Sequence, residues 1–146
     1  MQPSFREYAV QVITNARAFA DKISELGGCV ISGGTDNHMF SLHVTKSYGI
    51  GGKEAEVILE SVGISVNKNM VPFDERKPLD PSGIRIGTPA VTTRGMGVKE
   101  MYQLASVVHT ALSKPLDFSL HAMLKEEVAT LCKQFPIYMD QDLWTA

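Results

Sequence analysis

The chain has 146 residues, of which 44% are hydrophobic and 21% charged, and its net charge is -2. That balance is typical of one globular domain, and it gives no reason to expect nucleic acid or an anionic membrane as a partner. No apolar run approaches the roughly 20 residues of a membrane-spanning helix, and the N-terminus lacks the pattern of a signal peptide.

A long helix is expected over residues 1–27. Ser4 and Glu7 have the spacing of a capping box, which marks the start of a helix. Apolar side chains then recur at intervals of three and four until Gly27 and Gly28, so they form one stripe on a helix of about six turns. Because most helices have about three turns, we expect this one to bridge two bodies of protein rather than lie on one.

Short elements are expected next along the chain. Two strands, at residues 29–31 and 38–44, flank a cluster of turn-forming residues. A loop at residues 48–52 then leads to a short helix at residues 53–62, whose apolar side chains share one face.

Residues 64–95 hold most of the polar groups that could bind a ligand. Two short strands, at residues 64–66 and 83–86, flank a loop that contains three prolines. Polar side chains on loops held by rigid strands suit the binding of a small polar ligand. The candidates at the ends of these two strands are Asn67, Lys68, Asn69, Arg85, Thr88, Thr92, Thr93 and Arg94.

Two helices with apolar stripes complete the expected fold. The first covers residues 98–114, and the second begins after the capping residue Asp117 and ends at Pro136. The last residues, 139–146, show no period and are expected to fray. This order predicts one α/β (α+β) domain over residues 1–146, a two-layer sandwich of a small mixed or antiparallel sheet with helices on one face.

Arg85 is the most informative single residue for a binding site. It lies in the run Gly-Ile-Arg-Ile-Gly, where the alternation of a strand sends both isoleucines to one face and Arg85 to the other. The flanking glycines let a ligand or another backbone segment approach closely. A guanidinium binds a carboxylate through two parallel, charge-assisted hydrogen bonds, so a carboxylate site is one interpretation. An exposed arginine that covers the sheet is an equally good one.

Two asparagines and a second arginine are weaker candidates. Asn67 and Asn69 face the same way on an extended segment, where an amide suits the edge of a heterocyclic ring, although local Asx turns explain them slightly better. Arg94 could bind a phosphate or a carboxylate, but an arginine on a loop is more often simply solvated. Lys46 and Lys68 lack the surroundings that a Schiff-base lysine needs, so the residues alone indicate no covalent catalysis.

No metal or redox site is expected. The four histidines show no ligand spacing. Cys29 and Cys132 form neither a CxxC pair nor a disulfide framework, and each is expected to be a structural, buried thiol. The absence of paired cysteines fits a reducing compartment, so the sequence predicts a cytoplasmic protein.

Four motifs in this order resemble the C-terminal domain of the serine hydroxymethyltransferase family. They are SGGTDNH at residues 32–38, GKEAE at 52–56, VNKN at 66–69 and SGIRIGTPAVTTRG at 82–95. The likeness extends over nearly the whole chain, and the fourth motif is specific enough to indicate the family almost alone.

The resemblance implies a fold, an activity and roles for three residues. The family's members are fold-type-I pyridoxal phosphate enzymes, which interconvert serine plus tetrahydrofolate and glycine plus 5,10-methylenetetrahydrofolate. By resemblance, Arg85 matches the arginine that binds the α-carboxylate of the amino-acid substrate. Asn69 matches an asparagine that contacts the folate, and Arg94 matches a second arginine close to the active site.

The resemblance also implies that essential parts are missing from this chain. The family's cofactor lysine and most of its phosphate contacts belong to a large domain that has no counterpart here, so no catalytic residue is expected and the isolated chain should be inactive. The implied partners are that large domain or its polypeptide, serine or glycine, folate, and further copies in a homo-oligomer of the whole enzyme. The alternative is a stand-alone folate- or carboxylate-binding or regulatory domain without catalysis.

Overall fold

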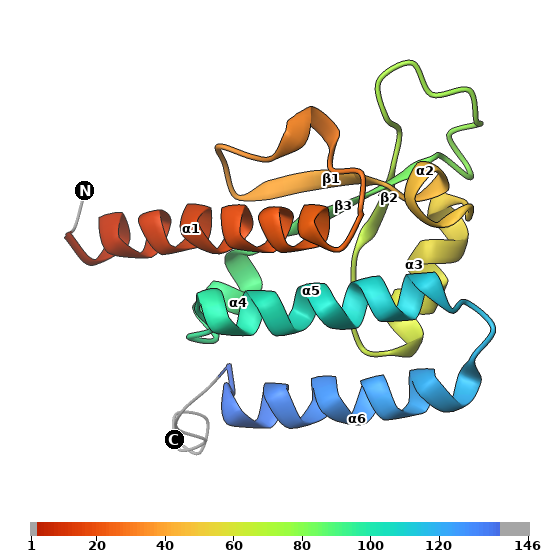
Figure 1. The fold of residues 1–146 in the computed structure, drawn as a ribbon. Helices are drawn as coiled ribbons and strands as arrows, with labels where there is room; N and C mark the ends of the chain where they lie inside the picture. The colour runs from red at the N-terminus through yellow and green to blue at the C-terminus, as the bar shows by residue number, and fades with distance from the viewer. Residues whose placement is uncertain (1–2, 138–146) are drawn as a thin grey trace, which may run out of the picture.

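Three strands and six α-helices make up residues 3–137, the part of the chain that the computed structural model describes (Figure 1). In chain order the elements are α1 (Pro3–Glu25), the 3-10 helix η1 (Ile31–Gly33), β1 (Met39–His43), α2 (Val44–Tyr48), α3 (Gly52–Ser61), β2 (Asn67–Asn69), β3 (Gly83–Gly87), α4 (Pro89–Thr93), α5 (Val98–Ser113) and α6 (Phe118–Gln134).

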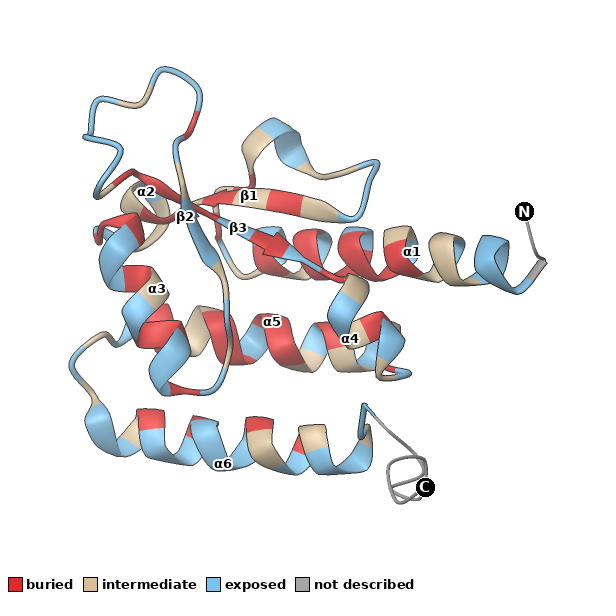
Figure 2. Ribbon diagram, turned by 180° about the vertical axis from the view of Figure 1, so that it is seen from behind, coloured by how far each residue is buried: buried red, intermediate tan, exposed pale blue. Residues whose placement is uncertain are grey.

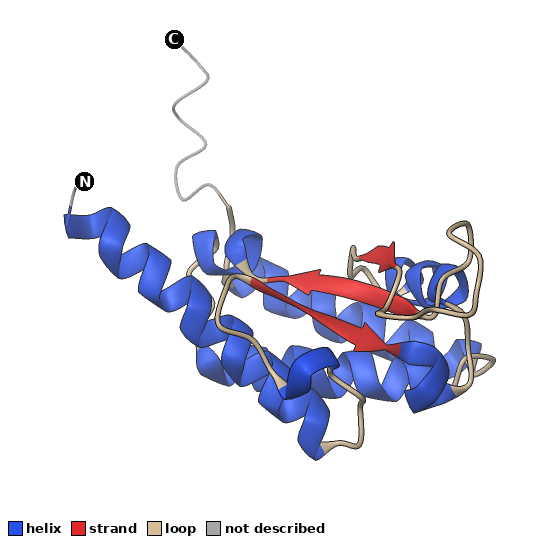
Figure 3. Cartoon of the chain, turned by 90° about the horizontal axis from the view of Figure 1, so that it is seen from above, coloured by secondary structure: helices blue, strands red, loops and turns tan. Residues whose placement is uncertain are grey.

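The sheet is antiparallel, with the strand order β1-β3-β2. Side chains alternate between its two faces, and the apolar set points toward the helices. Phe40 and Leu42 of β1 and Ile84 and Ile86 of β3 are all buried there. Figure 3 shows the strands lying over the helical layer. The expected small sheet with helices on one face is therefore confirmed, and its strands are antiparallel rather than mixed.

The core lies between the sheet and the long helices. Helices α1 and α5 pack along each other, and α6 packs against α5. Their buried residues, coloured red on the ribbon in Figure 2, belong to one hydrophobic cluster that also includes the inward-facing residues of the sheet. The largest fully buried members include Ile23, Leu42, Leu59, Ile84, Met101 and Leu112.

Helix α1 runs past the rest of the domain at its N-terminal end (Figure 1). Phe5 and Val10 expose more than half of their surface there, whereas Phe19 and Ile23 farther along the helix are buried. This shape suits the expected bridging role, which stays a prediction. The helix begins at Pro3, so Ser4 lies inside it and the expected capping box at Ser4 is wrong.

Two of the expected strands differ from the structure. Residues 29–31 make a single bridge, between Val30 and Leu42, because the chain turns at once into the 3-10 helix η1. The strand expected at 64–66 lies three residues later, as β2. Ile64 and Val66 instead pack against the core from a loop, so their apolar character reflects packing rather than strand pairing.

The segment after β3 was expected as a loop and is the helix α4. Pro89 occupies its first turn, where a missing amide hydrogen has no cost. Thr88 and Thr92 are buried and structural: the Thr88 hydroxyl donates to the Val12 carbonyl at 2.8 Å, and the Thr92 hydroxyl donates to the Thr88 carbonyl at 2.8 Å.

The remaining helices follow the sequence closely. Helices α3, α5 and α6 lie within two residues of their expected bounds, and Asp117 caps α6 by accepting a hydrogen bond from the Leu120 amide at 3.0 Å. Helix α2 was not expected. The tail at 139–146, expected to fray, lies outside the described residues. Within the described part, no helix has the length and apolar character to cross a membrane.

Candidate functional site

A row of polar side chains crosses the face of the sheet that points away from the helices. Arg85 of β3 pairs with Ser41 of β1 on one side and with Asn67 of β2 on the other. Residues paired directly across strands project to the same face, with Cβ atoms about 4.5–5.5 Å apart. We call Ser41, Arg85 and Asn67 the Arg85 row. The alternation expected for Arg85 is thus confirmed: Ile84 and Ile86 are buried and Arg85 is exposed.

The guanidinium of Arg85 makes no ion pair with any residue in the described part of the chain. By contrast, Arg17 pairs with Asp36 at 2.8 Å and Arg76 pairs with Asp80. An exposed guanidinium on a paired strand presents its planar fork of donors in a nearly fixed place. Arg85 is therefore an exposed arginine whose charge is not paired within the described residues.

Gly83 and Gly87, two residues to either side of Arg85, differ in the space that surrounds them. A Cβ on Gly83 would lie 2.7 Å from Cγ1 of Val71, so the loop after β2 packs where a side chain would stand. A Cβ on Gly87 would have no neighbour closer than 3.7 Å. Gly83 is therefore buried under the Val71 side chain, whereas Gly87 is exposed and a methyl group there would make only ordinary contacts.

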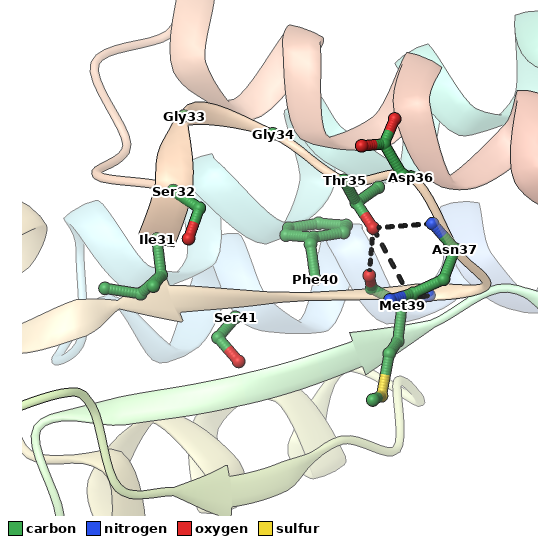
Figure 4. A pocket seen from close by; sticks show the side chains of 10 residues that line it. All are labelled: Ile31, Ser32, Gly33, Gly34, Thr35, Asp36, Asn37, Met39, Phe40 and Ser41. Atoms are coloured by element: carbon green, nitrogen blue, oxygen red, sulfur yellow. Dashed lines mark hydrogen bonds between the residues drawn. The ribbon is translucent and has the colours of Figure 1, made fainter.

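A hollow of about 570 Å³ adjoins the Arg85 row (Figure 4). Residues 31–37 form one wall and Met39, Phe40 and Ser41 form the other, so Ser41 belongs to both the row and the hollow. Ser32 holds a left-handed backbone with φ 61° in that loop, a rare conformation for a residue other than glycine. The volume is within the range of small-ligand pockets.

Asn69 lies two residues from Asn67 on the same face, directly opposite Gly83. It is half-buried, and its amide nitrogen donates to the carbonyl of Met70 at 2.9 Å. This local bond resembles the turn-type role that the sequence also allowed. Asn67 is exposed and lies nearer to Arg85 than Asn69 does in the register.

The carboxylate of Asp74 holds the proline-containing loop between β2 and β3 in place. It accepts hydrogen bonds from the amides of Val71, Arg76 and Ser82 and, at 2.6 Å, from the Ser82 hydroxyl. Burial raises the pKa of Asp74, but the bonds from Ser82, Arg76 and Val71 outweigh it and hold that pKa well below its usual value. The loop that leads into β3 is thus fixed by one ionised side chain.

Arg94 lies in a different place from the Arg85 row. It follows α4 and lines an apolar hollow of about 320 Å³, whose described lining residues include neither Arg85 nor Asn69. Its Nε atom is buried and has no hydrogen-bond partner among the described residues. Arg94 is half-buried at the end of α4, so it is less exposed than a freely solvated loop arginine.

Asn15 of α1 fixes α4 from inside the core. Its amide nitrogen donates to the Thr92 hydroxyl and to the Met96 carbonyl, both at 2.9 Å, and its oxygen accepts from Gln11 at 2.8 Å. Asn15 is fully buried, and both its amide nitrogen and its amide oxygen have hydrogen-bond partners. It therefore joins the long helix α1 to the segment after β3. Sequence reasoning missed it because its partners are about 80 residues away.

The lysines of this chain do not fit a pyridoxal phosphate site. Lys68 pairs with Glu56 at 3.1 Å and Lys46 is exposed, so neither lies in the protected pocket that a Schiff-base lysine needs. Among residues 3–137, every lysine is exposed except Lys22, which is half-buried and pairs with Glu25. Nor do three His, Cys, Asp or Glu side chains of these residues cluster as a metal site requires.

Residues 1–108 match the family model described as serine hydroxymethyltransferase. The chain belongs to the serine hydroxymethyltransferase family. It is 48% identical over 136 residues to the serine hydroxymethyltransferase of Mesoplasma florum, which covers 93% of this chain and 33% of that protein. It is 45% identical over 137 residues to the serine hydroxymethyltransferase of Rhodopirellula baltica, which covers 94% of this chain and 32% of that protein.

The chain therefore spans about a third of the length of these relatives. It corresponds to the C-terminal part of a serine hydroxymethyltransferase, which confirms the resemblance that the four motifs indicated. Family membership does not test the roles of Arg85, Asn69 and Arg94, which stay predictions.

Proposed function

We propose that this chain forms the substrate-binding small domain of a serine hydroxymethyltransferase. The whole enzyme would transfer a one-carbon unit between serine and tetrahydrofolate with pyridoxal phosphate as cofactor. Membership of the family supports this reaction class. The observation that carries the proposal is the exposed Arg85 guanidinium, which has no ion pair among the described residues and whose strand partner Ser41 lines a hollow beside β1.

Arg85 is proposed to bind the α-carboxylate of serine or glycine. The rigid strand β3 fixes its backbone, the open surface at Gly87 lets a ligand approach, and Ser41 supplies a neighbouring hydroxyl. A fork of two parallel hydrogen bonds would set both the position and the direction of the substrate. The role of this chain is therefore to orient the amino acid rather than to exchange a proton with it.

Asn69 is proposed to contact the folate from the same face of the sheet. Its nitrogen already donates to Met70, which leaves its oxygen to accept a hydrogen bond from a heterocyclic ring. Arg94 remains a candidate only through the resemblance, since the described residues place it in another hollow.

The cofactor is proposed to be held by the part of the family's length that this chain does not span. Pyridoxal phosphate chemistry needs a lysine in a protected site and a cradle for the phosphate. The exposed and ion-paired lysines described above offer no such site, so no chemical step is assigned to this chain. Its proposed partners are the cofactor-binding large domain and further copies of the whole enzyme, and the projecting end of α1 would connect the two domains.

The test is Arg85→Lys in an enzyme reconstituted from this chain and a polypeptide that carries the rest of the family's length. A lysine keeps the charge but loses the fork, and each charge-assisted hydrogen bond contributes about 1.5–3 kcal/mol. We expect serine to bind about tenfold or more weakly, with the thermal stability of the domain unchanged. Arg17→Lys, at an exposed arginine paired with Asp36, is the matched control. A serine affinity within about threefold of wild type would overturn the assignment.

A further inference from the structure

Helix α3 begins at a residue that cannot cap it with a side chain. Its N-cap is Gly51, although Ser, Thr, Asp and Asn suit this position because their side-chain oxygens accept from the free amides of the first turn. The backbone does not require glycine here. Gly51 has φ -79° and ψ 160°, an extended conformation that is usual for any N-cap residue. The space around Gly51, rather than its backbone, therefore excludes a side chain.

The missing acceptor comes from the loop between β2 and β3. The Oδ1 atom of Asp80 accepts from the Lys53 amide at 3.2 Å, which is the bond that an N-cap side chain makes with the second helical residue. A Cβ on Gly51 would lie 2.9 Å from the Cγ atom of Asp80, so the two side chains cannot share this place. The Gly52 amide also donates to the loop, at the Pro81 carbonyl 2.6 Å away. The first two amides of α3 are thus both bound by the loop.

The Asp80 carboxylate also forms an ion pair with Arg76, whose Nε atom donates to the Asp80 carbonyl at 3.0 Å. Both side chains lie near the surface, with 38% of Arg76 and 42% of Asp80 exposed. Ion pairs at such positions contribute little, whereas loss of an N-cap oxygen typically lowers the folded-to-unfolded ratio about fivefold. The bond to the Lys53 amide therefore contributes more to stability than the ion pair does.

Helix α3 holds strand β2 as well, and the two elements pack against each other. One turn after Gly52, the Glu56 carboxylate accepts from the Lys68 amide at 3.2 Å and pairs with the Lys68 ammonium group at 3.1 Å. Lys68 is the residue before Asn69. The helix therefore contacts the chain on both sides of the loop, at Lys68 before it and at Asp80 near its end.

We propose that Asp80 is a positioning residue with two effects: it caps α3, and it tethers the loop between β2 and β3 to that helix. Asp74 does not supply this tether, because its carboxylate bonds only to residues of the loop itself. Asn69 lies at the start of the loop, and Arg85 lies in the strand that follows it. The consequence for ligands rests on the function proposed above, in which these two residues contact the folate and the carboxylate.

Variants of Asp80 and Gly51 in the 146-residue chain test the cap. Asp80→Ala removes the acceptor, and we expect the folded-to-unfolded ratio, measured by urea denaturation, to fall about fivefold. Asp80→Asn keeps an oxygen for the Lys53 amide but loses the charge, so the ratio should change by about twofold or less. Gly51→Ser in the Asp80→Ala chain gives α3 a cap of its own and should restore most of the loss.

Gly51→Ser should act differently in the two backgrounds. In the wild-type chain the new side chain meets the Asp80 carboxylate, so the folded-to-unfolded ratio should fall or stay unchanged, whereas in the Asp80→Ala chain it should rise. Such non-additivity marks two side chains that compete for one place. Glu25→Ala, which breaks the pair with Lys22 at 3.0 Å, is the control, and its effect should be the same with or without Gly51→Ser.

Trypsin measures the tether, because it cleaves after Arg76 within the loop. The rate of this cleavage follows the population of the locally open loop, and cleavage after Arg17 in the middle of α1 reports global unfolding. Asp80→Ala should raise the rate at Arg76 about fivefold. Adding Gly51→Ser should not lower that rate again, because a cap on the helix itself does not reconnect the loop. A role in stability alone would instead restore the protection together with the folded-to-unfolded ratio.

Titration of tetrahydrofolate on the reconstituted enzyme measures the consequence for binding. Asp80→Ala should weaken binding about threefold or more, because a contact on an untethered loop is no longer held in place. Asp80→Asn should bind as wild type does, and Gly51→Ser added to Asp80→Ala should leave the loss in place. A reconstituted wild type that binds no tetrahydrofolate would refute the function proposed above, whereas the cap and the tether are decided by the unfolding and cleavage measurements.

Three results would each overturn the proposal. One is a loss of stability in Asp80→Asn equal to that in Asp80→Ala, which would assign the effect to the ion pair with Arg76. Another is an Asp80→Ala chain whose stability neither Gly51→Ser nor Gly51→Asp improves. The third is a cleavage rate at Arg76 that returns to the wild-type value in the chain with Gly51→Ser and Asp80→Ala, since Asp80 would then not hold the loop.

Discussion

Arg85 and Asn67 lie directly opposite each other on the neighbouring strands β3 and β2, on the face of the sheet that points away from the helices. The guanidinium therefore has an amide on one side and, through Ser41 of β1, a hydroxyl on the other. A carboxylate held by Arg85 would meet neutral hydrogen-bonding groups on both sides rather than competing charges.

Asn69→Ala tests the proposed folate contact. In the reconstituted enzyme the loss of the amide oxygen should weaken tetrahydrofolate binding by about 1–3 kcal/mol, because a polar partner would be left unsatisfied. Serine binding should not change. Titrating both ligands on the variant separates the two roles: equal weakening of both would show that Asn69 only supports the loop through its bond to Met70.

Gly83→Ala and Gly87→Ala form a matched pair on the strand that carries Arg85. A methyl group at residue 83 would meet the Val71 side chain at 2.7 Å and the Asn69 carbonyl at 2.9 Å, so we expect a loss of about 1–3 kcal/mol of unfolding free energy. The same change at residue 87 meets nothing closer than 3.7 Å and should be nearly neutral for stability. Urea denaturation measures both. Equal losses would contradict the claim that Gly83 alone is required by packing.

The lowered pKa of Asp74 makes the free energy of unfolding depend on pH. Its pKa is held below the usual 3.8 in the folded state, so its contribution is fully present above the unfolded value and is lost as the pH falls through the folded value. Wild type should therefore lose unfolding free energy as the pH drops from about 5 toward 2, and Asp74→Asn should lose less over the same range. Asp21→Asn, at an exposed residue of α1, is the control. Identical pH profiles for wild type and Asp74→Asn would contradict this account.

The sequence predicted the features that depend on local periodicity. The alternation around Arg85, the stripes of α1, α5 and α6, and the cap at Asp117 all follow from neighbouring residues. The pattern placed β2 three residues early, because Ile64 and Val66 are apolar for packing against the core rather than for strand pairing.

Long-range hydrogen bonds could not be predicted in this way. Asn15 meets Thr92 and Met96, and Asp74 reaches Ser82 across a loop, only because the fold brings them together. In the candidate site, too, features set by neighbouring residues could be predicted and features set by long-range pairing could not. Alternation predicted the face of Arg85, whereas its neighbour Ser41 depends on the pairing of β1 with β3. The resemblance to a family supplied the roles that neither local pattern nor geometry determines.

The central claim is that this chain orients substrates for an enzyme whose cofactor site lies outside it. The most direct measurement is turnover by purified residues 1–146 given pyridoxal phosphate, serine and tetrahydrofolate, with the aldimine absorbance recorded and glycine quantified. We expect no stoichiometric aldimine and no glycine from the chain alone, and glycine formation once a polypeptide with the family's cofactor lysine is added. Turnover by the chain alone would contradict the account. Binding of folate or serine with no activity even after that addition would favour a stand-alone binding domain instead.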